Sequence, residues 1–564
     1  MQDRGRPRTV ELLLADDDEA AVPRYGLPLE CLRSAPRPAP LDEPDALWDA
    51  TGDPNDLRRQ RWGLVAPSGP RGDRLLGLVE PLRRWRQEAQ GGAPVAVYRV
   101  RPVMDSAYAR GWKREVYRDE RTPEKDRPRY LLLLGDLHEL PLELQAELST
   151  DAYVGRLAFA ADADYEAYVA KVLRWEREPA RESRARLLFY TSRDGTSATE
   201  TGYRALITPS MAACRQRQED ADFPRADIHE LGGTQESLLA RASDVGAGVL
   251  FTLSHGRGRP PSGWAGPGER LAHQGELKLP DGRFLSADAL ASRPFVPGGV
   301  WFSFACFSAG TPSRSSYAHW LRKLPSTDPN ARRGLEALPR EGETPFIAAP
   351  ARAALANPDG PLAVLGHVDL AWSHSFSDRG QGTPSRFIEL LKELARGSRA
   401  GVALHTLTQV LNETSSELAS LYNQEEQERA GGLPSSIDLL ERARLWILRQ
   451  DLANYLLLGD PAVRLPLASP REPARAVAPA PAPADFNRLA SSVLRDQFRM
   501  PSLEAPAHGP EALEAVVLAL LSGQQDAGVL ADAHGVSVTE LRRWEALYRA
   551  AGLAALARHL SGQG

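Results

Sequence analysis

Two apolar segments that each end in a reactive side chain determine the predicted fold. They read GAGVLFTLSHG at 246–256 and GGVWFSFACFSAG at 298–310. Each contains a short, uninterrupted apolar run, which is typical of a parallel strand buried on both faces. The first run leads into His255 and the second into Cys306. Functional groups gather at the carboxyl edge of an open parallel sheet, so we expect these two side chains there.

Further apolar runs extend this pattern on both sides. They cover 62–67, 95–100, 129–136, 186–192 and 361–372, and helical stretches separate them. Buried strands that alternate with helices predict an α/β fold with a parallel sheet. The runs fall into an earlier and a later series, which indicates two similar sheets or subdomains.

Pro-rich segments divide the chain of 564 residues. They lie at 33–54 and 466–484, where proline disfavours helix and few apolar side chains are available for burial. We therefore predict five parts, in chain order: a lead-in (1–59), a first α/β subdomain (60–180), a catalytic α/β subdomain (181–467), an Ala/Pro-rich linker (468–485) and an all-helical module (486–564).

Composition and charge exclude several classes of protein. The formal net charge is −5, so no overall basic field would attract nucleic acid or an anionic membrane. The N-terminus has no apolar run of signal-peptide length, and no stretch approaches the length of a membrane span. The three cysteines are too few for a disulfide framework, which fits a reducing compartment. We expect a cytoplasmic protein without membrane contact.

Motifs for common cofactors and metals are missing from the sequence. There is no P-loop, no GxGxxG that opens a helix after a strand, no HExxH and no EF-hand loop. The GxSxG turn of serine hydrolases is missing too. The histidines lack metal-ligand spacing, and His367 and His374 fit ordinary strand-end positions. We predict no cofactor and no metal.

The pairing of His255 with Cys306 indicates nucleophilic chemistry. A thiolate, not a thiol, attacks a carbonyl, so a catalytic cysteine needs an imidazole to take its proton. Gly256 allows close approach of the backbone, and its N–H together with that of Cys306 would form an oxyanion hole. Cys31, beside the Pro-rich lead-in, and Cys214, in a predicted helix, are interpreted as incidental.

The order and spacing of these motifs resemble the caspase-like cysteine peptidases. Cys306 follows His255 by 51 residues, and caspases place these residues about 50 apart. Within that group the sequence is most similar to gingipain-type peptidases and to the bacterial CHAT family. Residues 131–175 resemble the first gingipain subdomain, and YLLLGDPAVRLPL at 455–467 resembles the segment that closes the catalytic one. The similarity covers roughly 60–467.

This resemblance implies a caspase-like fold and a cysteine endopeptidase that acts on a protein or peptide. His255 and Cys306 would be the catalytic residues, in a regulated protease of the bacterial defence or cell-death type. One departure concerns the caspase sequence Q-A-C-x-G, because here Phe304 and Ala305 precede Cys306 and the glycine is delayed to Gly310. A caspase-type preference for Asp is therefore not implied.

Three charged residues are candidates for substrate selection. Asp194 lies in the loop after the first strand of the catalytic subdomain, a loop that contributes to the substrate pocket of caspase-like folds. It could pair with an arginine of the substrate, and Asp369 is a competing candidate. The neighbouring Arg193 would favour an acidic substrate instead, so the preference stays open.

The C-terminal part resembles the helix-turn-helix of transposase-type DNA-binding modules. Gly535 would lie at the turn, and Ser537 or Thr539 would cap the following helix. Residues 486–564 contain seven arginines and eight acidic residues. DNA-binding modules usually present a basic surface instead. The balance favours a docking site for an activating protein over DNA binding, and both remain open.

Two other functions remain alternatives to the peptidase. A catalytically inactive scaffold would keep the fold and bind partners through its surface. A DNA-associated regulator would act through the C-terminal module. The scaffold predicts a blocked cleft or a histidine too distant from the cysteine.

Overall fold

The computed structural model describes residues 9–10, 27–28, 37, 52–101, 105–180, 182–220, 223–244, 246–260, 262–323, 334–378 and 381–468. The chain divides into two units, Met1–Arg471 and Glu472–Gly564, and all described residues belong to the first. The predicted helical module over 486–564 lies outside the described residues. So do Cys31 and the predicted linker from residue 469 onward.

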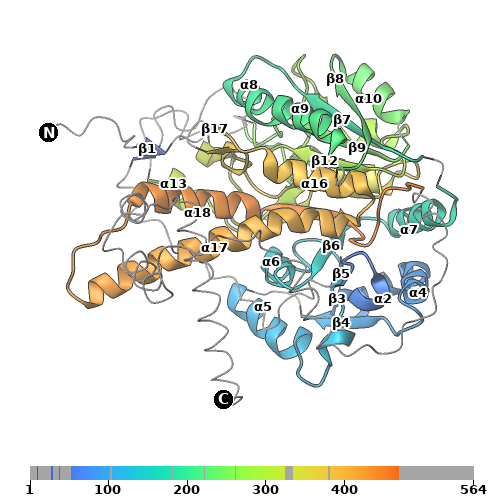
Figure 1. Ribbon diagram of the computed structural model, residues 1–564, viewed down its shortest axis with the longest axis horizontal. Helices are drawn as coiled ribbons and strands as arrows, with labels where there is room; N and C mark the ends of the chain where they lie inside the picture. Colours follow the sequence, from blue (N-terminus) through green and yellow to red (C-terminus); the bar gives the residue numbers. More distant parts are fainter. Residues whose placement is uncertain are drawn as a thin grey trace, which may run out of the picture. The chain divides into compact units, whose positions relative to one another are not determined.

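A ten-stranded sheet forms the centre of the first unit (Figure 1). Its strands, in spatial order, are β4 (Ala96–Val100), β3 (Trp62–Pro67), β5 (Tyr130–Leu134), β6 (Tyr153–Leu157), β18 (Tyr455–Gly459), β15 (Ala363–His367), β12 (Val300–Phe304), β9 (Gly248–Leu253), β7 (Ala185–Thr191) and β8 (Ala226–Leu231). Neighbouring strands are parallel, except that β18 runs antiparallel to β15. The predicted α/β class with a parallel sheet is confirmed, and the two series of strands share one sheet.

The apolar runs form the sheet because its central strands are buried on both faces, where most side chains are apolar. Every residue of β3, β5, β9, β12, β15 and β18 is buried. The edge strands β4 and β8 contain exposed positions instead, as expected where one side of the strand has no neighbour.

Helices connect the strands along the chain and cover the sheet. The longer ones are α3 (Pro70–Leu78), α4 (Glu80–Ala89), α6 (Leu142–Ser149), α7 (Asp162–Arg177), α9 (Thr208–Gln216), α10 (Gln235–Ser243), α15 (Ala349–Ala356), α16 (Ser385–Arg396), α17 (Ala400–Ala430) and α18 (Leu439–Ala453). Shorter helices are α2 (Leu57–Gln60), α5 (Ser106–Trp112), α8 (Ser197–Gly202), α11 (Pro267–His273), α12 (Ala287–Ala291) and α13 (Ala318–Leu321). Helices α16, α17 and α18 pack side by side (Figure 1).

Four small two-stranded sheets accompany the central one. They pair β1 (Thr9–Val10) with β2 (Leu27–Pro28), β10 (Leu277–Lys278) with β11 (Phe284–Leu285), β13 (Gly310–Thr311) with β14 (Phe346–Ile347), and β16 (Ser377–Asp378) with β17 (Gln381–Gly382). Two of them adjoin the segments that carry the predicted catalytic residues. The β10–β11 hairpin pairs with the loop after β9, and β13 begins four residues after Cys306.

A buried ionic network links the two halves of the sheet. Asp460, directly after β18, accepts hydrogen bonds from Arg86 Nε (2.7 Å) and Trp62 Nε1 (2.9 Å). Arg86 also forms a two-pronged ion pair with Glu176 of α7. Burial by itself lowers the pKa of Arg86, but Asp460 and Glu176 more than reverse that effect and raise it. The Gly-Asp-Pro segment therefore joins β18 to the first half of the sheet.

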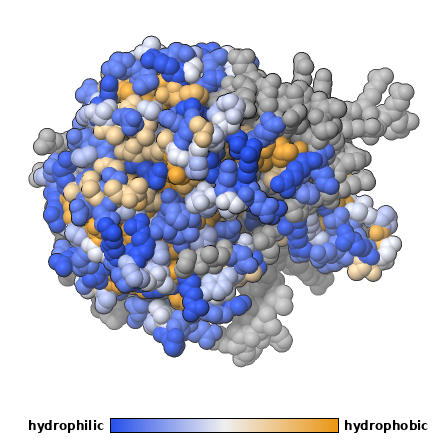
Figure 2. All heavy atoms as spheres, turned by 180° about the vertical axis from the view of Figure 1, so that it is seen from behind, coloured by the Kyte–Doolittle hydropathy of each residue, from blue (hydrophilic) through white to orange (hydrophobic). Residues whose placement is uncertain are grey.

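The surface combines hydrophilic residues with small apolar groups. Figure 2 shows a rear face that is mainly hydrophilic, with apolar residues scattered between the charged ones. Among the described helices, none has the length and apolar character that a membrane crossing requires.

Candidate active site

The sheet register brings His255 and Cys306 to matching positions. Strands β9 and β12 are parallel, with Leu253 opposite Phe304, and the ladder continues because Ser254 N donates to Phe304 O (3.1 Å). His255 and Cys306 each follow two residues after this last pair. Both predicted catalytic residues therefore lie at the carboxyl edge of adjacent strands, where the sequence places them.

Gly256 packs directly against the backbone of Cys306. A Cβ atom at position 256 would lie 1.8 Å from the carbonyl oxygen of Cys306, so no residue larger than glycine fits without a shift. Ladder bonds to the β10 segment are made by the neighbours, with Lys278 N donating to His255 O (2.9 Å) and Arg257 N to Glu276 O (2.7 Å). The Gly256 backbone therefore lies directly against that of Cys306, and the Gly256 N–H stays a predicted oxyanion donor.

The Cys306 thiol lies below the surface, against the loop that follows β15. The residue is 1% exposed, and its Sγ accepts a hydrogen bond from Ala371 N (3.3 Å). The next residue, Phe307, has a left-handed φ of 57° and donates its N–H to Asp369 O (2.8 Å). A non-glycine residue in that region stores strain, and such residues cluster at functional sites.

A hydrogen-bond relay connects His255 to Asp194 through Thr196. The Thr196 hydroxyl donates to Asp194 Oδ1 (2.8 Å), and its oxygen lies 2.7 Å from His255 Nε2. The single hydroxyl proton is committed to Asp194, so we assign the proton of the neutral imidazole to Nε2, which donates to Thr196. Nδ1 is then the basic nitrogen of the ring.

Asp194 provides the negative charge of this relay. Its Oδ2 lies 3.4 Å from His255 Nε2 and 3.6 Å from Lys278 Nζ, and Oδ1 also accepts a hydrogen bond from Thr199. Burial would raise the pKa of Asp194, but the charge of His255 and the two threonine hydrogen bonds outweigh it and lower the pKa. The structure thus brings Asp194, predicted as a substrate-binding residue, to the histidine.

Asp369, the second predicted substrate-binding residue, is buried beneath the site. Its Oδ1 accepts from Leu370 N (2.8 Å) and its Oδ2 from Ser316 N (3.1 Å), and its φ of 102° is left-handed. Burial raises the pKa of Asp369 to about 6, although hydrogen bonds, led by that from Leu370 N, oppose the shift. Its side chain shapes the loops on both sides of the thiol.

A second buried pair holds the loop after β15. His367 Nε2 lies 3.1 Å from Asp451 Oδ1, and both residues are fully buried. Asp451 also accepts from Trp372 N (3.0 Å) and Ser375 N (3.1 Å), which fixes the segment that carries Ala371. Burial would lower the pKa of His367, but the hydrogen bond and charge of Asp451 raise it. His367 is thus a buried strand-end histidine, as predicted.

Cys214 has the environment of an unreactive thiol. It lies on α9, inside the hydrophobic core, and burial raises its pKa to about 12. A thiol that ionises with such difficulty is a poor nucleophile at neutral pH. Of the two cysteines that the structure describes, only Cys306 follows a strand whose neighbour is followed by a histidine, His255.

A small hollow opens next to the thiol. About 330 Å³ of space lies between its lining residues, a figure that also counts open solvent at its mouth. Its lining consists of Ala198, Thr199, Leu253, Ser254, Phe304, Ala371, Trp372, Ser373 and Phe376. We call it the neutral hollow, because none of these residues is charged. Ala371 both lines it and donates to Cys306 Sγ, so the hollow lies within reach of a carbonyl bound at the thiol.

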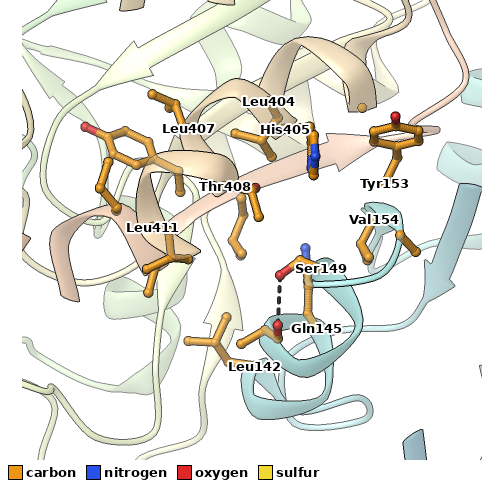
Figure 3. A pocket seen from close by; sticks show the side chains of 17 residues that line it. Leu142, Gln145, Ser149, Tyr153, Val154, Leu404, His405, Leu407, Thr408 and Leu411 are labelled. Carbon is orange, nitrogen blue, oxygen red and sulfur yellow. Dashed lines mark hydrogen bonds between the residues drawn. The ribbon is translucent and has the colours of Figure 1, made fainter. Parts of the chain in front are cut away.

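A separate pocket lies between the helices that cover the sheet (Figure 3). Leu142, Gln145 and Ser149 of α6 face His405 and its neighbours on α17, with Tyr153 of β6 beside the histidine ring. Burial lowers the pKa of His405 to about 4. This pocket contains no residue of the Cys306–His255 site. No group of three or more potential metal ligands occurs in the part of the chain that the structure describes.

Sequence reasoning missed three residues of the site. Thr196, Lys278 and Ala371 contact the relay or the thiol, yet they lie far from His255 or Cys306 in sequence. A signal exists only for Thr196, which caps α8 by accepting from Thr199 N. A Thr followed by a helix start after a strand predicts such a cap.

No protein-family model and no curated protein matches the chain. Among solved structures it is similar to the Arg-specific cysteine proteinase gingipain R, at 13% identity and a TM-score of 0.42, over 72% of this chain and 78% of that one. It is similar to the complex of Porphyromonas gingivalis RgpB pro- and mature domains at 12% and 0.41, over 72% and 79%. The Saccharomyces cerevisiae separase–securin complex matches at 11% and 0.25, over 62% and 17%.

Proposed function

We propose that the protein is a cysteine endopeptidase that uses Cys306 as nucleophile and His255 as general base. The observation that carries the proposal is the alignment of the two residues at adjacent strand ends, with His255 linked to Asp194 through Thr196. The relay leaves Nδ1 of His255 as the basic nitrogen. A carboxylate behind an imidazole stabilises the imidazolium that forms when the base takes a proton.

The proposed reaction proceeds in two stages. In the first, the Cys306 thiol gives its proton to His255 Nδ1 and its sulfur bonds to the scissile carbonyl carbon. The carbonyl oxygen becomes an oxyanion, which the N–H groups of Gly256 and Cys306 would hold. His255 then protonates the leaving amine as the C–N bond breaks. In the second, water attacks the thioester, His255 accepts its proton, and the thiol is released with the new carboxylate.

We assign Asp194 to positioning His255 rather than to binding the substrate. Both of its oxygens have partners inside the chain, in Thr196, Thr199, Lys278 and His255 itself. A substrate arginine would have to displace these contacts. Asp369 likewise has its carboxylate engaged by the backbone of two loops.

A catalytically inactive scaffold remains the second candidate. The observation in its favour is the burial of Cys306, which is 1% exposed and whose Sγ accepts a hydrogen bond from Ala371. A protease whose cleft opens when a partner binds would have the same resting structure. Docking of an activating protein or of DNA through 486–564, and a regulated role in defence or cell death, stay predictions.

Cleavage of a positional-scanning peptide library by the full chain tests the proposal. We expect cleavage by the natural protein, a loss of at least about 10³-fold in Cys306→Ala, and full activity in Cys214→Ala as the matched control. Cleavage that survives in Cys306→Ala would refute the proposed nucleophile. Absence of cleavage in all three proteins would favour the scaffold.

A further inference from the structure

The neutral hollow lies beside the Cys306 thiol, because Ala371 both lines it and donates to Cys306 Sγ. Its lining includes Leu253 and Phe304, the last residues of β9 and β12, two positions before His255 and Cys306. Its wall includes Ala371, whose N–H contacts the thiol sulfur at 3.3 Å. A peptide whose carbonyl carbon is at Cys306 Sγ therefore presents its adjacent side chain to this hollow.

Four large apolar residues of the lining are almost fully buried. Leu253, Phe304, Trp372 and Phe376 are between 0% and 5% exposed. The rings of Phe304 and Phe376 pack edge to face with centroids 5.4 Å apart. A substrate side chain that enters the hollow leaves water and contacts aromatic and aliphatic carbon atoms. This transfer is favourable for apolar side chains.

Two of the three hydroxyl groups on the wall, those of Thr199 and Ser254, donate to acceptors inside the protein. Thr199 Oγ1 donates to Asp194 Oδ1 (2.8 Å), and Ser254 Oγ donates to the Lys278 carbonyl oxygen. Neither hydroxyl carries a full charge that could pair with an ionic side chain. The wall can therefore accept neutral polar groups but offers no counter-ion.

The charged residues of the loop after β7, Asp194 and Arg193, have partners elsewhere in the protein. Asp194 lies behind Thr199 and has its partners in the histidine relay, with its side chain 5% exposed. Arg193 pairs with Glu200 (3.1 Å) and stacks over the ring of Tyr203 (4.6 Å to the centroid). These two residues were the competing candidates for a basic or an acidic preference, and neither lines the hollow.

We propose that the neutral hollow selects substrates with an uncharged residue before the cut, such as Leu or Ala, and rejects Arg, Lys, Asp and Glu. This inference rests on the proposed peptidase activity. The physical reason is that a charged side chain would lose its hydration in the hollow without gaining an opposite charge among the lining residues.

Peptidyl acyloxymethyl ketones that differ only in this residue test the inference. Each probe reacts when the thiolate sulfur bonds to the methylene carbon and the carboxylate leaves with the electrons of the broken C–O bond. Incubation of the full chain with Leu, Ala, Arg, Lys and Asp probes, followed by peptide mapping, gives the labelling rate at Cys306. We expect the Leu and Ala probes to react at least about tenfold faster than the charged ones.

The outcomes separate the inference from the proposed function. Fastest labelling by an Arg, Lys or Asp probe overturns the neutral preference and leaves the peptidase intact. No labelling of Cys306 by any probe contradicts the peptidase itself, and the preference falls with it.

A single substitution provides the complementary test. Ala198 lines the mouth of the hollow and is partly exposed, so Ala198→Asp adds a carboxylate at its rim. We expect the ratio of Arg to Leu labelling to rise at least about tenfold, since the new acid pairs with the guanidinium. Ser197→Asp adds the same charge on the exposed side of α8 and should leave the ratio unchanged. An unchanged ratio in Ala198→Asp would show that the hollow does not receive this side chain.

Discussion

Two buried networks in this molecule each place a carboxylate opposite a nitrogen base, but the two bases differ. At the sheet junction, Asp460 and Glu176 face Arg86. At the candidate site, Asp194 faces His255 through Thr196. A guanidinium stays charged at every physiological pH, whereas an imidazole gains and loses a proton near neutrality. The junction pair can therefore only hold elements together, while the site pair can also move a proton.

The two networks also differ in what surrounds the carboxylate. Asp460 is fixed by Arg86, the Trp62 indole and its own loop, through Ala462 N. Asp194 is held by threonine hydroxyls, which both donate and accept, and its Oδ2 also lies 3.6 Å from Lys278 Nζ. A hydroxyl can donate to a carboxylate and accept from an imidazole at the same time. It can therefore link the two groups, which an arginine, a donor only, cannot do.

Removal of the junction cation should produce the largest effect. We expect Arg86→Ala to lower the free energy of unfolding by about 3–5 kcal/mol, because it leaves Asp460 buried without its counter-ion. Chemical denaturation measures this loss. Arg84→Ala on the same helix, where the side chain is 74% exposed, should cost less than about 1 kcal/mol. Equal losses of unfolding free energy in the two variants would contradict a stabilising role for the buried Arg86–Asp460–Glu176 network.

Asp369 should give the site its own pH dependence of stability. Its pKa is about 6 in the folded protein, against an ordinary value of 3.8, so the folded state holds more protons than the unfolded chain between these values. Stability must then fall as pH rises through that window, by at most about 3 kcal/mol, and stay level above it. Unfolding measured against Asp369→Asn from pH 4 to pH 7 should reveal this slope. Parallel curves for the two proteins would contradict it.

Loss of the site carboxylate should cost activity more than stability. We expect Asp194→Asn to lower kcat/KM about 10²-fold, because the amide keeps the shape but no longer stabilises the imidazolium. The pH–activity profile should change as well, which a purely structural role would not produce. Asp281→Asn, on the exposed turn of the β10–β11 hairpin, is the control and should leave the profile unchanged. A normal profile in Asp194→Asn would remove Asp194 from the relay.

The smallest effect on activity should come from a change in Thr196, which links Asp194 to His255. Thr196→Val keeps the shape but removes the hydroxyl that lies 2.7 Å from His255 Nε2, a hydrogen bond worth about 1 kcal/mol. We expect kcat/KM to fall about fivefold with KM nearly constant. Thr191→Val is the control, because the Thr191 hydroxyl has no hydrogen-bond partner among the described residues. Equal activity of the two variants would argue against the relay.

The apolar runs of the sequence predict most strands of the sheet, including the edge strand β4 within 95–100, but not β6, β8 or β18. WGLVAP at 62–67 coincides with β3, and the runs that lead into His255 and Cys306 contain β9 and β12. Strand β8 is not predicted, because ADIHEL at 226–231 is a partly exposed edge strand with charged side chains. The antiparallel direction of β18 follows from long-range pairing with β15, which no local pattern encodes.

The same limit applies to the candidate site. Strand-end positions are local, so His255, Cys306 and Asp194 can be found from sequence. The roles of Ala371, Lys278 and Asp451 depend on loops that meet only in the folded chain. A carboxylate after a strand looks the same in sequence whether it faces a substrate or a histidine, which is why Asp194 was expected in the pocket.

Capture of an acyl-enzyme tests the central claim most directly. The full chain is mixed with a Leu-terminated peptide ester, quenched in acid, and the mass of the protein and of its peptides is measured. We expect a thioester on Cys306 that forms at least about 10²-fold more slowly in His255→Ala and is missing in Cys306→Ala. Acylation at another residue, or an equal rate in His255→Ala, would contradict it.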